Sequence, residues 1–155
     1  MNIIPSIVVP IITDKKITNE NLFNLFRDKF IIVFGVPGAF TPTCSEEHLP
    51  GFIDLNQQIK KKGIEDIYCL SVNDAYVMKS WLRGFDNGTK IKGIADGNAD
   101  VAKSLNLIID KSSSFMGLRC LRFAMIVKNN IILKLFIDDP AKFEISSAEN
   151  ILQNI

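Results

Sequence analysis

The sequence predicts an α/β fold with a central mixed β-sheet that is flanked by helices on both faces. The continuous apolar run Phe30–Phe34 is typical of a strand that is covered on both sides, and Ile64–Val72 is interpreted as the next buried strand. A helix is expected between them, from about Cys44 to Lys62. Near the end of the chain, the turn Lys128-Asn129-Asn130 separates two more apolar runs and predicts a hairpin, because Asn tolerates left-handed backbone angles.

Pro50 lies inside the long helix that is expected between the two buried strands. It cannot donate a hydrogen bond to the carbonyl of Glu46, and it disfavours helical angles at Leu49. We therefore expect the helix to kink near His48 to Gly51.

The remaining elements are expected from apolar spacing and helix-capping residues. Together with the elements above they form the pattern of the thioredoxin-like fold, which several other α/β folds share. In order, they are an extended start at Ile7–Ile12, a helix capped by Thr18 that runs through Leu22, Leu25 and Phe26, a helix at Asp74–Phe85, a short strand at Ile91–Ala95, a brief helix at Asp100–Leu105, the hairpin strands Arg122–Val127 and Ile131–Ile137, and a last helix at Ser146–Ile155.

Composition favours one globular domain over residues 1–155, since 47% of the residues are hydrophobic and can bury a core. The net charge of +1 offers no electrostatic reason to expect nucleic acid or an anionic membrane surface as a partner. No apolar run is long enough to span a membrane, and the start lacks the pattern of a secretory signal. We expect a soluble protein of the cytoplasm, or of a mitochondrion or plastid if a targeting presequence has been removed.

Three cysteines, Cys44, Cys69 and Cys120, are an odd number at wide spacings, which argues against a disulfide framework. His48 is the only histidine and the sequence holds no Cys-x-x-Cys pair, so no metal site is expected, and no cofactor. The pattern indicates a reducing compartment and, if the chain is an enzyme, chemistry at a thiol.

Cys44 has the setting of a functional thiol in the stretch GVPGAFTPTCSEEH, which covers residues 35–48. It follows a strand and a Pro/Gly loop, so its sulfur is expected in the first turn of a helix at the carboxyl end of that strand, where ligand crevices of α/β sheets lie. A helix N-terminus stabilises an anion by only about 0.3–1 kcal/mol, and Glu46 and Glu47 oppose a thiolate there. A nearby cation is therefore required, and Arg122 is favoured because it begins an apolar strand, with Arg119 as the second choice.

Four further residues of the loop and helix have candidate roles around this thiol. Thr41 lies three residues before Cys44, where its hydroxyl could donate to the sulfur and accept from a substrate, or could simply cap the helix. Pro37 and Pro42 would supply apolar walls and restrict the loop. His48 is one turn beyond Cys44 and could act as a base, but a role in hydrogen bonds that brace the loop is preferred.

The spacing Pro37-x-x-x-Thr41-x-x-Cys44 resembles the active-site motif of the peroxiredoxins, and the wider stretch is similar to the peroxiredoxin 5 type. Two further blocks, residues 69–78 and residues 121–125, agree with this resemblance. It implies a thioredoxin-like fold and a homodimeric thiol peroxidase for hydrogen peroxide and organic hydroperoxides. Cys44 would be the peroxidatic nucleophile and would become a sulfenic acid.

The same resemblance implies that Thr41 and Arg122 hold the peroxide and that Pro37 shields the site from water. Many relatives of this type carry a resolving cysteine near the C-terminus, whereas no cysteine follows Cys120 here. Cys69, which lies in an apolar strand, and Cys120, which lies two residues before Arg122, remain as candidate resolving cysteines, but a structural role is preferred for each. We therefore expect a one-cysteine mechanism in which glutathione, a glutaredoxin or thioredoxin reduces the sulfenic acid of Cys44. A thiol-disulfide exchange protein and a redox sensor or binding module on the same fold are the alternatives.

Overall fold

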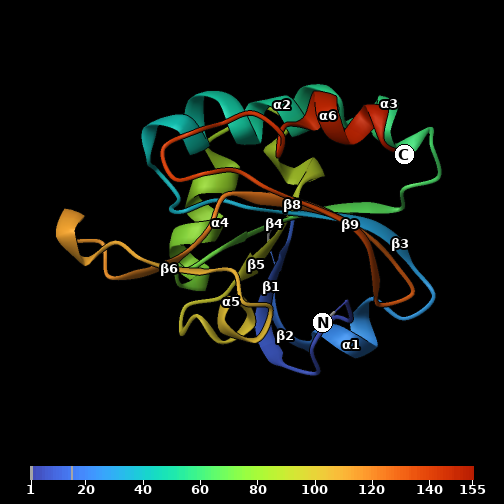
Figure 1. The fold of residues 1–155 in the computed structure, drawn as a ribbon. Helices are drawn as coiled ribbons and strands as arrows, with labels where there is room; N and C mark the ends of the chain where they lie inside the picture. Colours follow the sequence, from blue (N-terminus) through green and yellow to red (C-terminus); the bar gives the residue numbers. More distant parts are fainter. Residues whose placement is uncertain (1, 15) are drawn as a thin grey trace.

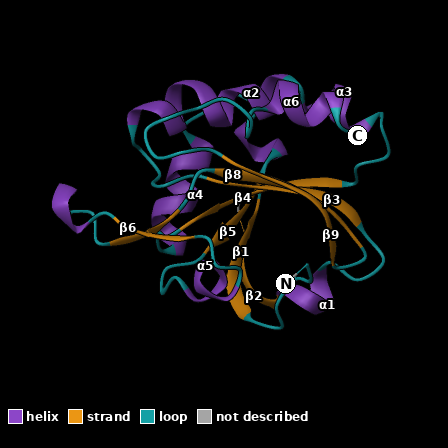
Figure 2. Ribbon diagram, viewed as in Figure 1, coloured by secondary structure: helices purple, strands orange, loops and turns teal. Residues whose placement is uncertain are grey.

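The computed structural model describes residues 2–14 and 16–155, which form a seven-stranded mixed sheet between two groups of helices (Figure 1, Figure 2). The strand order is β2-β1-β5-β4-β3-β8-β9. Strands β3, β4 and β5 run parallel, while β1 and β8 flank them in antiparallel orientation. The bounds are β1 Val8–Thr13, β2 Lys16–Asn21, β3 Phe30–Gly35, β4 Asp66–Ser71, β5 Lys92–Ala95, β8 Phe123–Lys128 and β9 Ile131–Ile137. The predicted thioredoxin-like α/β fold is confirmed.

The helices cover both faces of the sheet, as predicted. Four of them, α2 (Leu49–Asp54), α3 (Asn56–Lys60), α4 (Ala75–Arg83) and α6 (Ala148–Gln153), pack on one face, and α1 (Leu22–Leu25) and α5 (Asp100–Ser104) pack on the other (Figure 1). Each layer encloses its own hydrophobic core. The central strands supply both cores, because successive side chains of a strand point to opposite faces. In β3, for example, Ile32 and Phe34 face one core while Ile31 and Val33 face the other.

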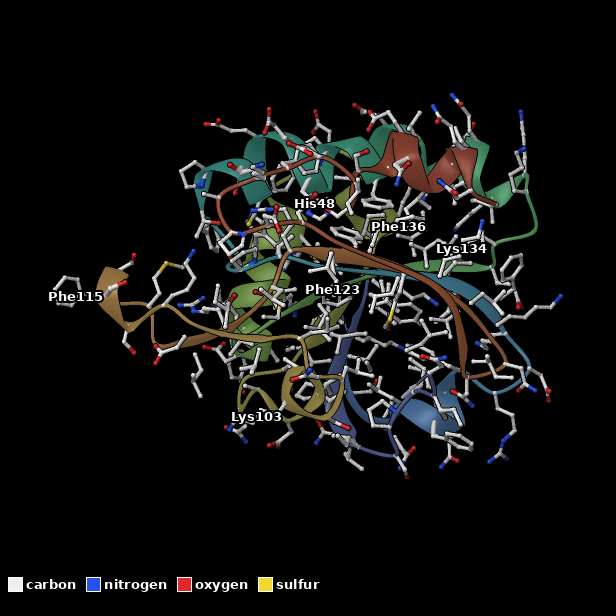
Figure 3. The ribbon with its side chains drawn as sticks, in the orientation of Figure 1. His48, Lys103, Phe115, Phe123, Lys134 and Phe136 are labelled. Atoms are coloured by element: carbon white, nitrogen blue, oxygen red, sulfur yellow. The ribbon has the colours of Figure 1, made fainter. Side chains whose placement is uncertain are left out.

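A two-stranded arm made of β6 (Ile108–Asp110) and β7 (Leu118–Cys120) projects from the main sheet (Figure 1). The sequence analysis did not predict it, because its strands are only three residues long. A 3₁₀ turn, η3 (Ser112–Ser114), lies near the tip, where the side chain of Phe115 is 98% exposed and points away from the molecule (Figure 3).

Two sequence expectations about helices are wrong in detail. Thr18 caps no helix: it lies in β2 and pairs with Ile11 of β1, and Asn21 caps α1 instead by accepting from the backbone N–H of Asn24. The hairpin already satisfies the backbone of residues 16–21, so the helix begins only where that pairing ends.

The long helix expected from Cys44 to Lys62 is divided into a π-helical turn, η1 (Cys44–His48), followed by α2 and α3. The change from π to α bonding falls at Leu49, within the region where Pro50 predicts a disturbance, and a second interruption occurs at Leu55. The hairpin turn between β8 and β9 is confirmed, because Asn129 and Asn130 both adopt positive φ, of 47° and 67°. None of the helices formed by the described residues is long and apolar enough to cross a membrane.

Candidate active site

Cys44 lies at the carboxyl ends of β3 and β4, where the loop of residues 36–43 leads from β3 into η1. Helical geometry already begins at Pro42, and Cys44 is the first residue of the π-helical turn. Its carbonyl accepts from the backbone N–H of Leu49 instead of His48. Because Pro50 has no N–H, it cannot complete the ordinary α-helical bond to Glu46 one turn earlier. The predicted position of the thiol, in the first turn after a central strand, is confirmed.

The guanidinium of Arg122 lies at the sulfur of Cys44 and is the cation that the sequence analysis required there. Arg122 lies immediately before β8, beside β3 in the sheet, and its Nη2 donates to Cys44 Sγ at 3.2 Å. Its Nη1 lies 2.9 Å from His48 Nδ1, and the ring of Phe143 lies 5.9 Å from its guanidinium carbon. The guanidinium thus connects the thiol to the imidazole.

His48 is held in one tautomer by its two partners. Its Nε2 lies 2.9 Å from the carbonyl oxygen of Ser146, which can only accept, so Nε2 carries the hydrogen and Nδ1 accepts from Arg122. Burial and the positive charge of Arg122 lower the pKa of His48 to about 3, against the opposing effects of the Ser146 carbonyl and the Asp138 charge. The ring is fully buried between the sheet and α2 (Figure 3). The preferred interpretation of His48 as a bracing residue agrees with this geometry, and a neutral ring that is already hydrogen-bonded at both nitrogens is poorly suited to act as a base.

Thr41 and Pro37 lie in the loop that approaches Cys44. The hydroxyl of Thr41 donates to the carbonyl of Gly38 at 2.6 Å, so its hydrogen is directed to the loop backbone and not to the sulfur. Its lone pairs can still accept from a substrate. Phe40, next to Thr41, has a positive φ of 65°, which shows how tightly the loop turns before η1.

Several hydrogen bonds from other elements support this loop. Asn73, which follows β4, accepts from the backbone N–H of Ala39 at 3.0 Å. Arg119 of β7 donates to the carbonyls of Met116, at 2.9 Å, and Pro37, at 3.3 Å. Arg119, the second-choice cation, is therefore not the partner of Cys44; its side chain joins the arm to the active-site loop.

A cavity of about 460 Å³ opens beside the site. Pro37, Thr41, Pro42 and Arg122 line it, together with apolar side chains of the arm and of the segment that follows β9. The position of Cys44 at the carboxyl end of a strand suggested a thiol that is open to a small oxidant, but this is wrong, because Cys44 is 0% exposed and does not itself line the cavity. The sulfur lies in the core on the α2 side of the sheet, but it is not enclosed by apolar groups alone, because Arg122 both contacts it and reaches the cavity.

Cys69 and Cys120 lie in buried positions of β4 and β7. Burial raises the pKa of both thiols well above the usual range, with smaller contributions from the neighbouring cysteine thiols and, at Cys120, from Asp96. The thiol of Cys120 donates to the carbonyl of Val36 at 3.1 Å. Neither residue has the environment of a reactive thiol. Among the described residues, no group of three or more His, Cys, Asp or Glu side chains is arranged to hold a metal ion.

Sequence reasoning missed two residues at the site, Asp138 and Ser146, which connect to His48. They lie 94 and 102 residues after Cys44, in the segment between β9 and α6, and no motif marks them. Sequence reasoning also missed the indole of Trp81 on α4, which donates to the hydroxyl of Ser45 at 3.0 Å.

Known proteins are similar to this chain in fold and in sequence over nearly its whole length. A sequence model of the Redoxin family matches residues 4–152. Peroxiredoxin-2C of rice, Oryza sativa subsp. japonica, is 41% identical over 140 residues, which are 90% of this chain and 86% of that protein. The crystal structure of reduced Prx3 from Vibrio vulnificus in complex with H₂O₂ has a TM-score of 0.92 and 42% identity, covering 98% of this chain and 95% of that chain. The antioxidant protein of Plasmodium falciparum, a 1-Cys peroxiredoxin, has a TM-score of 0.89 and 37% identity, covering 99% and 98%.

The fold has a thioredoxin-like sheet, and a cysteine in the first turn after β3 is hydrogen-bonded to an arginine. Together these features define a thiol-dependent oxidoreductase. The chain belongs to the Redoxin family and, within it, to the peroxiredoxins. It is therefore a thiol-dependent peroxidase, and the resemblance of its sequence to this family is confirmed.

Proposed function

We propose that Cys44 is the peroxidatic residue and that it acts as a thiolate. Its sulfur attacks one oxygen of the peroxide, the O–O bond breaks, and the second oxygen takes a proton from solvent water and leaves as water or an alcohol. Cys44 is thereby oxidised to a sulfenic acid and the peroxide is reduced. The contact of 3.2 Å between Arg122 Nη2 and Cys44 Sγ carries this proposal, because a fixed cation stabilises the thiolate and can follow the negative charge onto the leaving oxygen.

Thr41 and Pro37 are proposed to complete the peroxide site. The Thr41 hydroxyl donates to the carbonyl of Gly38, so it is available to accept a hydrogen bond from the peroxide. Pro37 forms part of the apolar wall that keeps water from the sulfur. Because Cys44 is buried, a peroxide reaches it only when the groups between sulfur and cavity shift locally.

Both hydrogen peroxide and organic hydroperoxides are proposed as substrates. The cavity of about 460 Å³ is many times larger than hydrogen peroxide, and its lining includes apolar side chains such as Ile109, Leu121 and Phe143. These apolar side chains can hold the organic group of an alkyl hydroperoxide. The ratio of second-order rate constants for cumene hydroperoxide and hydrogen peroxide measures the preference.

A one-cysteine cycle is proposed, in which an external thiol reduces the oxidised Cys44. Burial and the raised pKa of Cys69 and Cys120 make both poor nucleophiles toward a sulfenic acid. The similar Plasmodium falciparum protein is described as a 1-Cys peroxiredoxin. Glutathione with glutaredoxin is the proposed reductant, with thioredoxin as the alternative.

A homodimer is proposed, formed through the face around the active-site loops. Three aromatic side chains are exposed on the segments that meet there: Phe40 is 63% exposed, Tyr76 80% and Phe115 98%. Phe40 and Tyr76 follow the adjacent parallel strands β3 and β4, and the arm that carries Phe115 contacts the loop of Phe40 through Arg119. Light scattering of Phe115→Ser against the unmodified chain tests this proposal, which predicts a shift toward monomer.

The compartment is proposed to be the cytoplasm or an organelle. One similar protein, Peroxiredoxin-2E-2 of rice, is described as chloroplastic. Microscopy of the full-length protein in its own cell distinguishes the two.

Peroxide consumption with glutathione and glutaredoxin, followed with mass analysis of the protein, tests the catalytic proposal. Cys44→Ser is expected to abolish turnover, whereas Cys69→Ser and Cys120→Ser are expected to keep both the first oxidation and recycling. Turnover that survives in Cys44→Ser contradicts the proposed nucleophile. If Cys120→Ser blocks recycling but not the first oxidation, the one-cysteine cycle is wrong. Oxidation of Cys44 without turnover with any thiol favours the sensor alternative.

A further inference from the structure

The buried carboxylate of Asp138 organises the segment between β9 and α6. Asp138 is only 4% exposed, and it accepts hydrogen bonds from the backbone N–H of Ile145 at 2.9 Å and from both the backbone N–H, at 3.2 Å, and the hydroxyl, at 2.5 Å, of Ser146. Burial alone would raise the pKa of this carboxyl, but these hydrogen bonds outweigh it and lower the pKa below its usual value. A buried charge with three donors holds its partners in one geometry.

This segment reaches Cys44 through an unbroken series of hydrogen bonds. Ser146 is hydrogen-bonded to Asp138, and its carbonyl accepts from His48 Nε2 at 2.9 Å. His48 Nδ1 accepts from Arg122 Nη1 at 2.9 Å, and Arg122 Nη2 donates to Cys44 Sγ at 3.2 Å. The backbone N–H of Asp138 also donates to the carbonyl of Arg122 at 2.9 Å. Asp138 therefore bonds both to Ser146, where the series begins, and to the backbone of Arg122, whose side chain contacts the sulfur.

We propose that Asp138 and Ser146 are positioning residues for the peroxidase reaction, which hold His48 so that Arg122 is aimed at the sulfur of Cys44. This inference rests on the proposed roles of Cys44 and Arg122. The Ser146 carbonyl keeps the hydrogen of the imidazole on Nε2, and Nδ1 can then accept a hydrogen bond from Nη1 of the guanidinium. Because Nη1 is hydrogen-bonded to His48 and the guanidinium is planar, Nη2 is directed at the sulfur. The Arg122 side chain has then already lost its rotamer freedom when the peroxide binds.

The start of α6 has hydrogen bonds of its own that do not involve Asp138. The hydroxyl of Ser147 accepts from the backbone N–H of Asn150 at 3.2 Å, and the Asn150 side chain donates to the carbonyl of Ile145 at 2.7 Å. A variant of Asp138 is therefore expected to fold with α6 in place, while the hydrogen bonds that hold Ser146 are weakened.

The first test compares Asp138→Asn with Glu144→Gln, which removes an exposed carboxylate from the same segment. The rate constant for oxidation of Cys44 by hydrogen peroxide is measured by mass analysis of rapidly quenched samples. Asp138→Asn is expected to lower it at least about tenfold, because an amide nitrogen cannot accept from the Ser146 N–H. Glu144→Gln is expected to stay within about twofold of the unmodified protein. Equal rates in all three proteins overturn the proposal.

The second test asks whether Asp138 acts through Arg122. In an Arg122→Lys background, which lacks the guanidinium fork, adding Asp138→Asn is expected to change the rate constant less than about twofold. A second tenfold loss in that background would mean that Asp138 affects the site by another route, and it overturns the inference. Ser146→Thr, which keeps the hydroxyl, is expected to retain the rate constant that Ser146→Ala loses, and equal losses in the two variants also overturn it.

These outcomes are distinct from failure of the proposed function itself. If the unmodified protein oxidises no faster than Cys44→Ser, the proposed nucleophile is wrong. If the unmodified protein reacts and Asp138→Asn reacts equally well, only the positioning role is wrong.

Discussion

The indole of Trp81 donates to the hydroxyl of Ser45 at 3.0 Å, which connects α4 to the residue that follows Cys44. Trp81 is the only tryptophan in the chain, and it is 1% exposed. The environment of this one indole therefore depends on the conformation of the π-helical turn that carries the thiol.

Oxidation of Cys44 is expected to change the fluorescence of Trp81. An added oxygen on a buried sulfur must displace its neighbours, because the core is close-packed, and Ser45 is the next residue. The change should follow stoichiometric peroxide in stopped flow, be absent in Cys44→Ser, and persist in Cys69→Ser. A signal of equal size in Cys44→Ser would show that the indole responds to something other than this thiol.

Replacement of Arg122 is expected to slow the reaction with peroxide more than it affects folding. A charge-assisted hydrogen bond is worth about 1.5–3 kcal/mol, so Arg122→Ala should lower the second-order rate constant by roughly 10- to 100-fold. Arg119→Ala removes a cation of the same site that bonds only to backbone carbonyls, Met116 and Pro37. It should act mainly through the position of the loop and have the smaller effect. A larger loss of the rate constant in Arg119→Ala than in Arg122→Ala would show that Arg122 is not the cation on which the reaction depends.

His48 is expected to make the folded protein sensitive to acid. Its pKa is about 3 in the folded state against 6.5 for an ordinary imidazole, so the unfolded chain binds more protons between these values. The free energy of unfolding therefore falls as the pH drops below about 6.5, by an amount of the order of 4 kcal/mol at pH 3.

Urea unfolding at pH 7 and pH 4 measures this effect. His48→Gln, which cannot titrate, is expected to be less stable than the unmodified protein at pH 7 but to lose less stability on going to pH 4. An identical loss in both proteins would show that other groups account for the acid sensitivity.

Gly35 at the end of β3 is expected to tolerate no side chain. A Cβ at this position would lie 2.0 Å from the ring of Phe123 in β8, so Gly35→Ala should destabilise the protein by about 2–3 kcal/mol through overpacking. Gly51 in α2 is the matched control, because its added Cβ would lie 3.6 Å from Ala148, which is ordinary contact. Gly51→Ala should be neutral or slightly stabilising, since alanine favours a helix. Thermal unfolding of both variants compares them, and similar melting temperatures would contradict the prediction.

Much of the fold followed from local patterns. The continuous apolar run at β3 and the largely apolar stretch at β4 predicted buried strands, and the asparagines at 129 and 130 predicted the turn between β8 and β9. These signals are strong because burial and backbone angle constrain residue type directly. Strand β2 was not predicted, because its polar sequence at the sheet edge has no apolar period and depends on pairing with β1.

The candidate site was predictable to the extent that its residues form a motif. Pro37, Thr41 and Cys44 lie within eight positions of one another, and the need of a thiolate for a cation pointed to Arg122. The direction of the Thr41 hydroxyl was not predictable, since it depends on the tight loop turn that brings the carbonyl of Gly38 within 2.6 Å.

The amino-acid sequence alone determined the α/β class, the thiol that was placed after a central strand, and the family to which the chain belongs. Only the tertiary structure decided that Cys44 is buried, that His48 is neutral, and that Asp138 and Ser146 are connected to Arg122 through His48. The physical reason is that burial and hydrogen-bond direction arise from the packing of segments far apart in the chain, here residues 44–48, 122 and 138–146. No local spacing records such contacts, because each segment is compatible with many partners until the sheet brings them together.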